Sequence, residues 1–126
     1  MKLRIRGNSI RMRVTQSELA EIAADGEVRE TVEFGDATLT YALVRDAFDS
    51  APSASFRDNV ITLRLPADTV RRWVETRQVS IRASQRLEHG GELQLLVEKD
   101  FACLEPRPGE DESDTFPHPE AGGKRG

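Results

Sequence analysis

Residues 2–14 have the sequence KLRIRGNSIRMRV, in which two alternating runs flank the pair Gly7-Asn8. Alternation of charged and aliphatic residues is typical of a strand with one buried face, and a two-residue turn containing glycine joins two such strands in a hairpin. With this turn, Arg4 lies opposite Arg11. The stretch therefore predicts a hairpin with one apolar face and one cationic face.

The period of the pattern changes directly after this hairpin. Thr15-Gln-Ser-Glu18 is a capping box, in which the Thr15 hydroxyl accepts from the Glu18 amide and the Glu18 carboxylate accepts from the Thr15 amide. Val14 and Leu19 form the hydrophobic staple that accompanies such a cap. Gly26 follows the apolar stripe and predicts the end of the helix.

Further alternating runs surround two more polar turns, Gly35-Asp36 and Asp58-Asn59. A proline in the first turn of a helix is tolerated, so Pro66 predicts the start of a second helix. The strands expected are 2–6, 9–14, 27–34, 37–44, 53–57, 60–65, 78–83 and 92–101.

The order hairpin–helix–hairpin occurs twice, at an offset of 51 residues that matches Ile10 with Ile61 and Val28 with Val79. The offset favours an internal duplication, although any two units of this kind share the pattern. Eight twisted antiparallel strands either close into a barrel or split into two packed sheets. We therefore expect an α+β fold of about eight mostly antiparallel strands with two helices, in a barrel-like or two-sheet arrangement, the barrel-like form being favoured.

Charge and composition divide the chain into two parts. Residues 1–104 carry 16 acidic and 15 basic residues and are predicted to form a single domain, whereas residues 105–126 carry six acidic and three basic residues. The Pro- and Gly-rich second part predicts a disordered acidic tail, in which Phe116 is the large apolar residue that could dock onto the domain.

The same composition bounds the location and the partners of the protein. No apolar run has the length that spans a bilayer, and the charged N-terminus is unlike a signal peptide. One cysteine forms no internal disulfide, so we expect a cytoplasmic protein. The nearly neutral domain argues against a nucleic-acid partner.

Cations lie opposite cations on the first hairpin, which destabilises a strand pair unless something compensates. Glu30, Glu33, Glu98 and Asp100 are acids that could interleave with them as an ordinary charged sheet face. Alternatively, the arginines line a concave face that binds an anion such as phosphate. The candidate anion-binding residues are Arg4, Arg6, Arg11, Arg13 and Arg64, with Arg82 as a further member.

Other chemistry is less well supported by the sequence. Cys103 lacks a nearby base, because His89 lies at the opposite end of its strand and His118 in the tail, so an inert cysteine is expected. No metal-ligand spacing is present, and no cofactor is expected. A carboxylate site for Mg²⁺ or Mn²⁺ would require Glu30, Glu33 and Glu98 to converge.

The segments KLRIRGNSIR, residues 2–11, and VEKDFACL, residues 97–104, resemble a family of short bacterial proteins of unknown function. The likeness covers nearly the whole domain and implies no activity. The segment Leu3-Arg-Ile-Arg6 also resembles a strand of the triphosphate tunnel fold, in which Arg, Lys and Glu side chains hold a triphosphate with a divalent metal. The opening Glu-x-Glu-x-Lys strand of that fold is absent here.

Two functional hypotheses follow from these observations. The first is a small non-enzymatic module that binds an anionic ligand or a protein partner. The alternative is a metal-dependent phosphohydrolase or cyclase of the triphosphate-tunnel type. The acidic tail could further act as an interaction segment that competes for the arginines.

Overall fold

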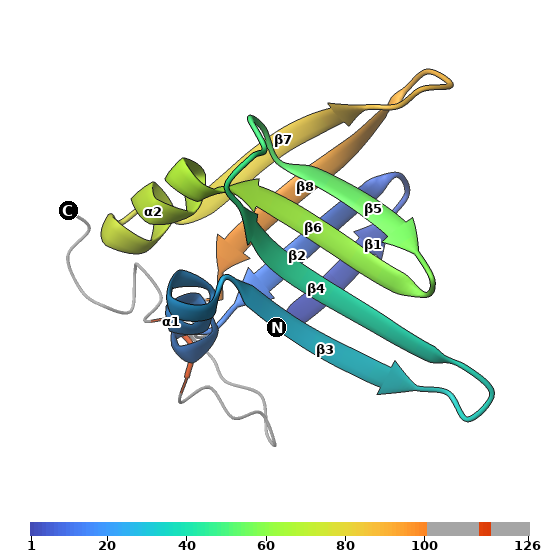
Figure 1. Ribbon diagram of the computed structural model, residues 1–126, viewed down its shortest axis with the longest axis horizontal. Helices are drawn as coiled ribbons and strands as arrows, with labels where there is room; N and C mark the ends of the chain where they lie inside the picture. The colour runs from blue at the N-terminus through green and yellow to red at the C-terminus, as the bar shows by residue number, and fades with distance from the viewer. Residues whose placement is uncertain (101–113, 117–126) are drawn as a thin grey trace.

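Each alternating run of the sequence forms a strand, and each short polar turn joins two strands in a hairpin (Figure 1). The computed structural model describes residues 1–100 and 114–116. Its elements are β1 (Lys2–Arg6), β2 (Ser9–Val14), α1 (Gln16–Asp25), β3 (Glu27–Glu33), β4 (Thr38–Asp46), β5 (Ser53–Arg57), β6 (Val60–Pro66), α2 (Ala67–Glu75), β7 (Ser80–Arg86) and β8 (Glu92–Lys99).

The strands form two sheets, each of which takes one hairpin from either half of the chain. The first sheet has the order β1-β2-β8-β7 and the second the order β3-β4-β6-β5. Hairpin partners are antiparallel, whereas the central pairs β2–β8 and β4–β6 are parallel. The α+β prediction with eight strands and two helices is therefore confirmed, in sheets that are mixed.

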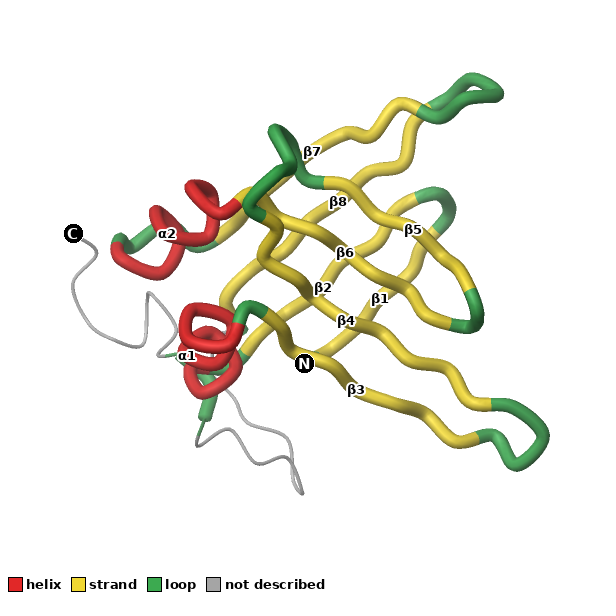
Figure 2. Tube along the Cα trace, viewed as in Figure 1, coloured by secondary structure: helices red, strands yellow, loops and turns green. Residues whose placement is uncertain are grey.

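The two-sheet arrangement forms, and the favoured barrel does not. Figure 2 shows the strands of the two sheets crossing steeply, with both helices on the same side of the molecule. The edge strands β7 and β5 of the two sheets are joined by a side chain and not by strand pairing. The Gln85 amide on β7 accepts from Ala54 N on β5 at 2.6 Å and donates to Ala54 O at 3.1 Å. A side-chain bridge between these strands leaves the sheets as separate layers.

The turns and caps follow the local sequence. Asp58 and Asn59 both have positive φ, as a type I′ hairpin turn requires. The capping box of α1 is present, since Thr15 N donates to the Glu18 carboxylate at 2.9 Å and the Thr15 hydroxyl accepts from Glu18 N at 3.4 Å. Gly26 ends α1 with a φ of 82°, and the Arg45 guanidinium packs directly against it.

The predicted boundaries at the start of the second helix and after it were wrong by a few residues. Pro66 is the last residue of β6 and the N-cap, so α2 begins one residue later. The strand expected at 78–83 runs over Ser80–Arg86. In the first half of the chain Val28 pairs with Leu43, and in the second half Ile81 pairs with Val97. The residue equivalent to Val28 is therefore Ile81 and not Val79, so the offset of 51 residues does not extend beyond α2.

The hydrophobic core fills the space between the sheets and beneath the two helices. Trp73 of α2 is fully buried, and its indole NH donates to Val79 O at 3.0 Å, which satisfies the one polar group of that side chain. The buried core consists of Met12, Val14, Leu19, Ile22, Val28, Leu43, Ile61, Leu63, Leu65, Val70, Trp73, Ile81, Leu95 and Val97.

Residues 114–116 lie against the start of α1. The Asp114 carboxylate accepts from Ser17 N at 3.1 Å and from the Ser17 hydroxyl, and these bonds lower the pKa of Asp114. Phe116 N donates to Asp100 O at 2.7 Å, and the Phe116 ring packs against the core and beneath the Lys99 ammonium. The predicted docking of Phe116 is confirmed, whereas the tail prediction for residues 105–113 and 117–126 lies outside the described residues.

Within residues 1–100 and 114–116, neither helix has the length or apolarity needed to cross a bilayer.

Substitution of Met12 by alanine tests the core between the sheets. Met12 is completely buried, so we expect the Met12→Ala variant to lose about 2–5 kcal/mol of unfolding free energy, measured by urea denaturation. Ile5 on the adjacent strand is 58% exposed and supplies the control, because Ile5→Ala should cost less than about 1 kcal/mol. Equal losses in the two variants would contradict this placement of the core.

Candidate anion-binding site

The outer face of the first sheet carries a row of cations across its four strands. Arg4 on β1 lies opposite Arg11 on β2, Arg11 lies beside Leu96 on β8, and Leu96 lies opposite Arg82 on β7. Three of the four positions in this row are therefore arginines. The predicted Arg4–Arg11 register is confirmed, and the parallel pairing of β2 with β8 brings Arg82 into the same row.

The acids that compensate for part of this charge lie in the next row of the same face and just beyond the end of β8. Glu98 lies beside Arg13 and accepts from Arg13 Nε at 2.9 Å and from Arg11 Nε at 2.7 Å. Asp100 lies 3.2 Å from Lys2 Nζ. Burial opposes the charge on Glu98, but its hydrogen bonds to Arg11 and Arg13 and their positive charge outweigh burial and lower the pKa of its carboxyl.

Three arginines of this face are left without such a partner. Arg4, Arg6 and Arg82 are exposed, and their guanidinium groups form no hydrogen bond or ion pair with residues 1–100 or 114–116. Together with Arg11 they line a concave pocket of about 470 Å³. Ser9, Gln94 and Leu96 complete the side chains of this face that line it, so the arginine pocket offers several cations, a hydroxyl, an amide and an apolar floor.

The structure separates two of the predicted residues from the pocket. Arg13 lies one row away and is paired with Glu98. Arg64 lies on β6 in the second sheet, opposite Ser53, and donates to the Ser55 hydroxyl at 3.1 Å. The sequence reasoning had placed Arg64 with the others by strand parity, but the alternation of faces does not specify which sheet a strand joins.

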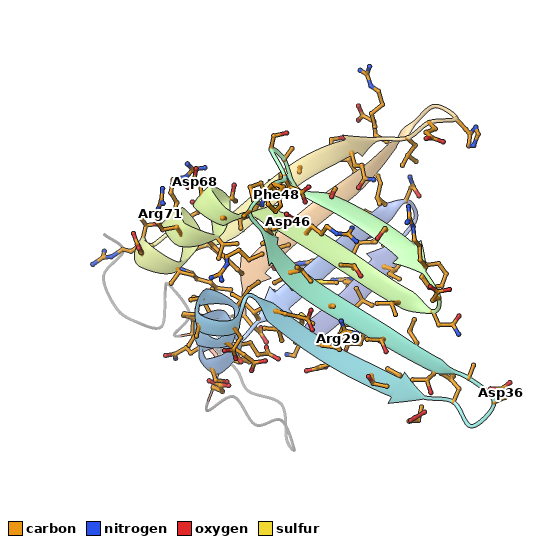
Figure 3. All side chains as sticks on the ribbon, viewed as in Figure 1. Arg29, Asp36, Asp46, Phe48, Asp68 and Arg71 are labelled. Atoms are coloured by element: carbon orange, nitrogen blue, oxygen red, sulfur yellow. The ribbon has the colours of Figure 1, made fainter. Side chains whose placement is uncertain are left out.

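The equivalent row of the second sheet is different in character. It contains Ser55, Thr62, Ala42 and Arg29 in the corresponding positions. Arg29, labelled on β3 in Figure 3, is paired with Glu27 at 2.9 Å, and this contact raises its pKa. A concentration of unpaired arginines is therefore specific to the first sheet and does not arise from the fold alone.

The three carboxylates that the alternative hypothesis of a metal-dependent enzyme requires do not converge. Glu30 accepts from the Met1 amino group at 2.8 Å and from the Tyr41 hydroxyl at 2.7 Å, whereas Glu33 accepts from the Thr38 hydroxyl at 2.5 Å. Burial and the neighbouring Glu30 raise the pKa of Tyr41 to about 12. Glu98 is held by arginines instead, so the three acids form three separate contacts.

Glu30 lies on the same side of β3 as the buried Val28, and its contact with the Met1 amino group explains a carboxylate at this position. Within the described part of the chain, no three His, Cys, Asp or Glu side chains are placed to hold a metal ion. His89 is exposed in the β7–β8 turn. Cys103 and His118 lie outside the described residues.

The sequence comparisons agree with the resemblance found in the sequence. A family of unknown function, DUF7009, matches residues 1–120, and the chain belongs to this family. No curated protein and no solved structure matches the chain.

Substitution of Glu98 by glutamine tests the electrostatics beside the pocket. Since the folded pKa of Glu98 is below the ordinary value of 4.5, its contribution to stability is fully present above about pH 4.5 and is lost as the pH falls through the folded pKa. The Glu98→Gln variant should lose about 1.5–3 kcal/mol of unfolding free energy at pH 7, as expected for hydrogen bonds to charged groups. On acidification the variant should lose less additional stability than the wild type does.

Denaturation at pH 7 and at several acidic pH values would measure both effects. Glu21→Gln is the matched control, because Glu21 is exposed on α1 and forms no ion pair within the described residues. A Glu98→Gln variant as stable as the wild type at pH 7 would contradict the assigned role.

Proposed function

We propose that this protein is a small cytoplasmic module that binds an anionic small molecule in the arginine pocket. One observation carries the proposal: Arg4, Arg6 and Arg82 line one concave surface and have no acidic partner among the described residues, although Glu98 and Asp100 neutralise the cations of the next row. Unpaired cations placed side by side repel one another, so a bound anion would stabilise them.

The chemistry of the pocket favours phosphate groups or carboxylates. A guanidinium presents a planar set of donors that matches the oxygens of either group in a bidentate manner. Ser9 and Gln94 also line the pocket, where the Ser9 hydroxyl donates to Arg6 O at 2.6 Å and the Gln94 amide nitrogen donates to the Ser84 hydroxyl at 3.1 Å. Because Arg4 and Arg82 lie on the two edge strands of the sheet, a ligand that reaches both needs more than one anionic oxygen group or an extended head.

A binding role fits this pocket better than metal-dependent phosphoryl chemistry. The latter needs carboxylates that hold Mg²⁺ or Mn²⁺ beside the phosphate. Glu30 and Glu33 contact Met1 and Thr38 instead, and Glu98 faces two arginines.

The proposal includes an origin by internal duplication. If the two halves of the chain are exchanged, the order β1-β2-β8-β7 becomes β5-β6-β4-β3, which is the order of the second sheet. In this view the anion site evolved in one of two equivalent sheets. Family members whose halves align at these equivalences would support the duplication, and half-to-half scores no better than those of shuffled sequences would contradict it.

Removal of two unpaired arginines tests the proposed site. The wild-type protein should be stabilised by pyrophosphate or triphosphate at low ionic strength, by about 2.7 kcal/mol at 100 times the dissociation constant, measured as a thermal shift. Salt should weaken the effect, because the pocket is open to solvent. The Arg4→Ala, Arg82→Ala double variant should retain its fold and lose most of this shift.

Arg57→Ala is the matched control, since Arg57 is exposed on β5 at the position equivalent to Arg6. It should respond to the anions like the wild type. A full ligand response in the double variant would contradict the assignment of the site. A wild-type protein that binds single-stranded oligonucleotides but none of the small anions would contradict it as well.

A further inference from the structure

The end of the molecule that lies opposite the helices carries hairpin turns from both sheets. Figure 2 places the β1–β2 and β5–β6 turns on this side, away from α1 and α2. Side chains join the two sheets at two other places, because Gln85 accepts from Ala54 N at 2.6 Å and Tyr41 donates to Met1 O at 3.3 Å. Residues of both hairpins line a space that opens at this end.

An apolar cavity of about 490 Å³ occupies this open end. Its size falls within the range of small-molecule sites. Ile5 and Phe56 stand at its mouth and remain 58% and 66% exposed, although both point to the same side of their sheets as the core. The apolar lining, which we call the inter-sheet cavity, includes Ile5, Ile10, Leu39, Phe56, Leu87 and Leu93.

The inter-sheet cavity adjoins the arginine pocket. Ser9 and Ile10, which are neighbours on β2, line both of them. Their side chains point to opposite faces of the sheet, Ser9 toward the pocket and Ile10 toward the cavity. The strand β1 is an edge strand, and along it Ile5 faces the cavity while its neighbours Arg4 and Arg6 face the pocket. The edge strand β1 and its turn therefore lie between Arg4 and Arg6 on one side and the apolar cavity on the other.

We infer that the ligand of the arginine pocket is an anionic amphiphile, an inference that rests on the proposed function. Its phosphate or carboxylate head binds in the arginine pocket beside Arg4 and Arg6 of the edge strand β1, and its alkyl chain passes the β1–β2 turn into the inter-sheet cavity. Charge complementarity selects the head, and the lining of the cavity selects the chain. Binding covers Ile5 and Phe56, which removes the exposed apolar surface that the fold leaves at this end.

A series of alkyl phosphates tests this inference on the full chain. Affinities of methyl, butyl, hexyl and octyl phosphate, measured by calorimetry below their micelle concentrations, should increase by up to about fourfold per buried methylene group. The Ile5→Asn, Phe56→Asn variant should bind methyl phosphate as the wild type does and should lose most of the dependence on chain length. The Arg4→Ala, Arg82→Ala variant should lose affinity for every member of the series.

Val32→Asn, Phe34→Asn is the matched control, because these residues are 39% and 62% exposed near the β3–β4 turn and do not line the cavity. Its dependence on chain length should equal that of the wild type. Octanol, which has the chain without the anion, should bind far more weakly than octyl phosphate.

Three results would overturn the inference and leave the proposed function intact. The first is an affinity that is independent of chain length although methyl phosphate binds. The second is octanol binding as tight as that of octyl phosphate. The third is a wild-type dimer in sedimentation that Ile5→Asn, Phe56→Asn dissociates, since a second copy would then cover the cavity. Failure of the phosphate esters and also of pyrophosphate and triphosphate to bind at low salt would instead overturn the proposed function itself.

Discussion

The parallel pairing of β2 with β8, and of β4 with β6, is the constraint on which the rest of the structure depends. Each half of the chain supplies hairpins that are too small to be stable alone. Parallel neighbours require long connections, and the remaining elements of the chain provide them. The pairing places Met12 beside Val97 and Leu43 beside Leu63, so the same contacts that join the halves also form the centre of the core.

The same pairing determines the electrostatics of the first sheet. Only when β8 lies beside β2 does Glu98 reach Arg11 and Arg13, and only then does Leu96 separate Arg11 from Arg82. One carboxylate compensates for the two guanidinium groups of Arg11 and Arg13. Arg4, Arg6 and Arg82 have no acidic partner among the described residues. The fold thus divides its cations into a structural set and an available set.

Sequence reasoning succeeded where the interactions are local. The β1–β2 register, the Thr15 cap and the cationic face all follow from neighbours in the chain. It could not identify which hairpins share a sheet, because a parallel pair between distant strands leaves no local signal. For this reason Arg64 was grouped with the wrong sheet, and the contribution of Leu96 to the pocket was not predicted.

The exchange of hairpins between the halves also affects how the chain can fold during synthesis. Val14 and Glu92 are nearly 80 residues apart, and at about 5–20 residues per second β8 emerges roughly 4–16 s after β2. During that interval the edge of β2 has no final partner. Sheets built from distant strands fold slowly, because loop-closure entropy is lost before their contacts form. Nascent chains of this protein therefore expose a cationic hairpin until the last strand is complete.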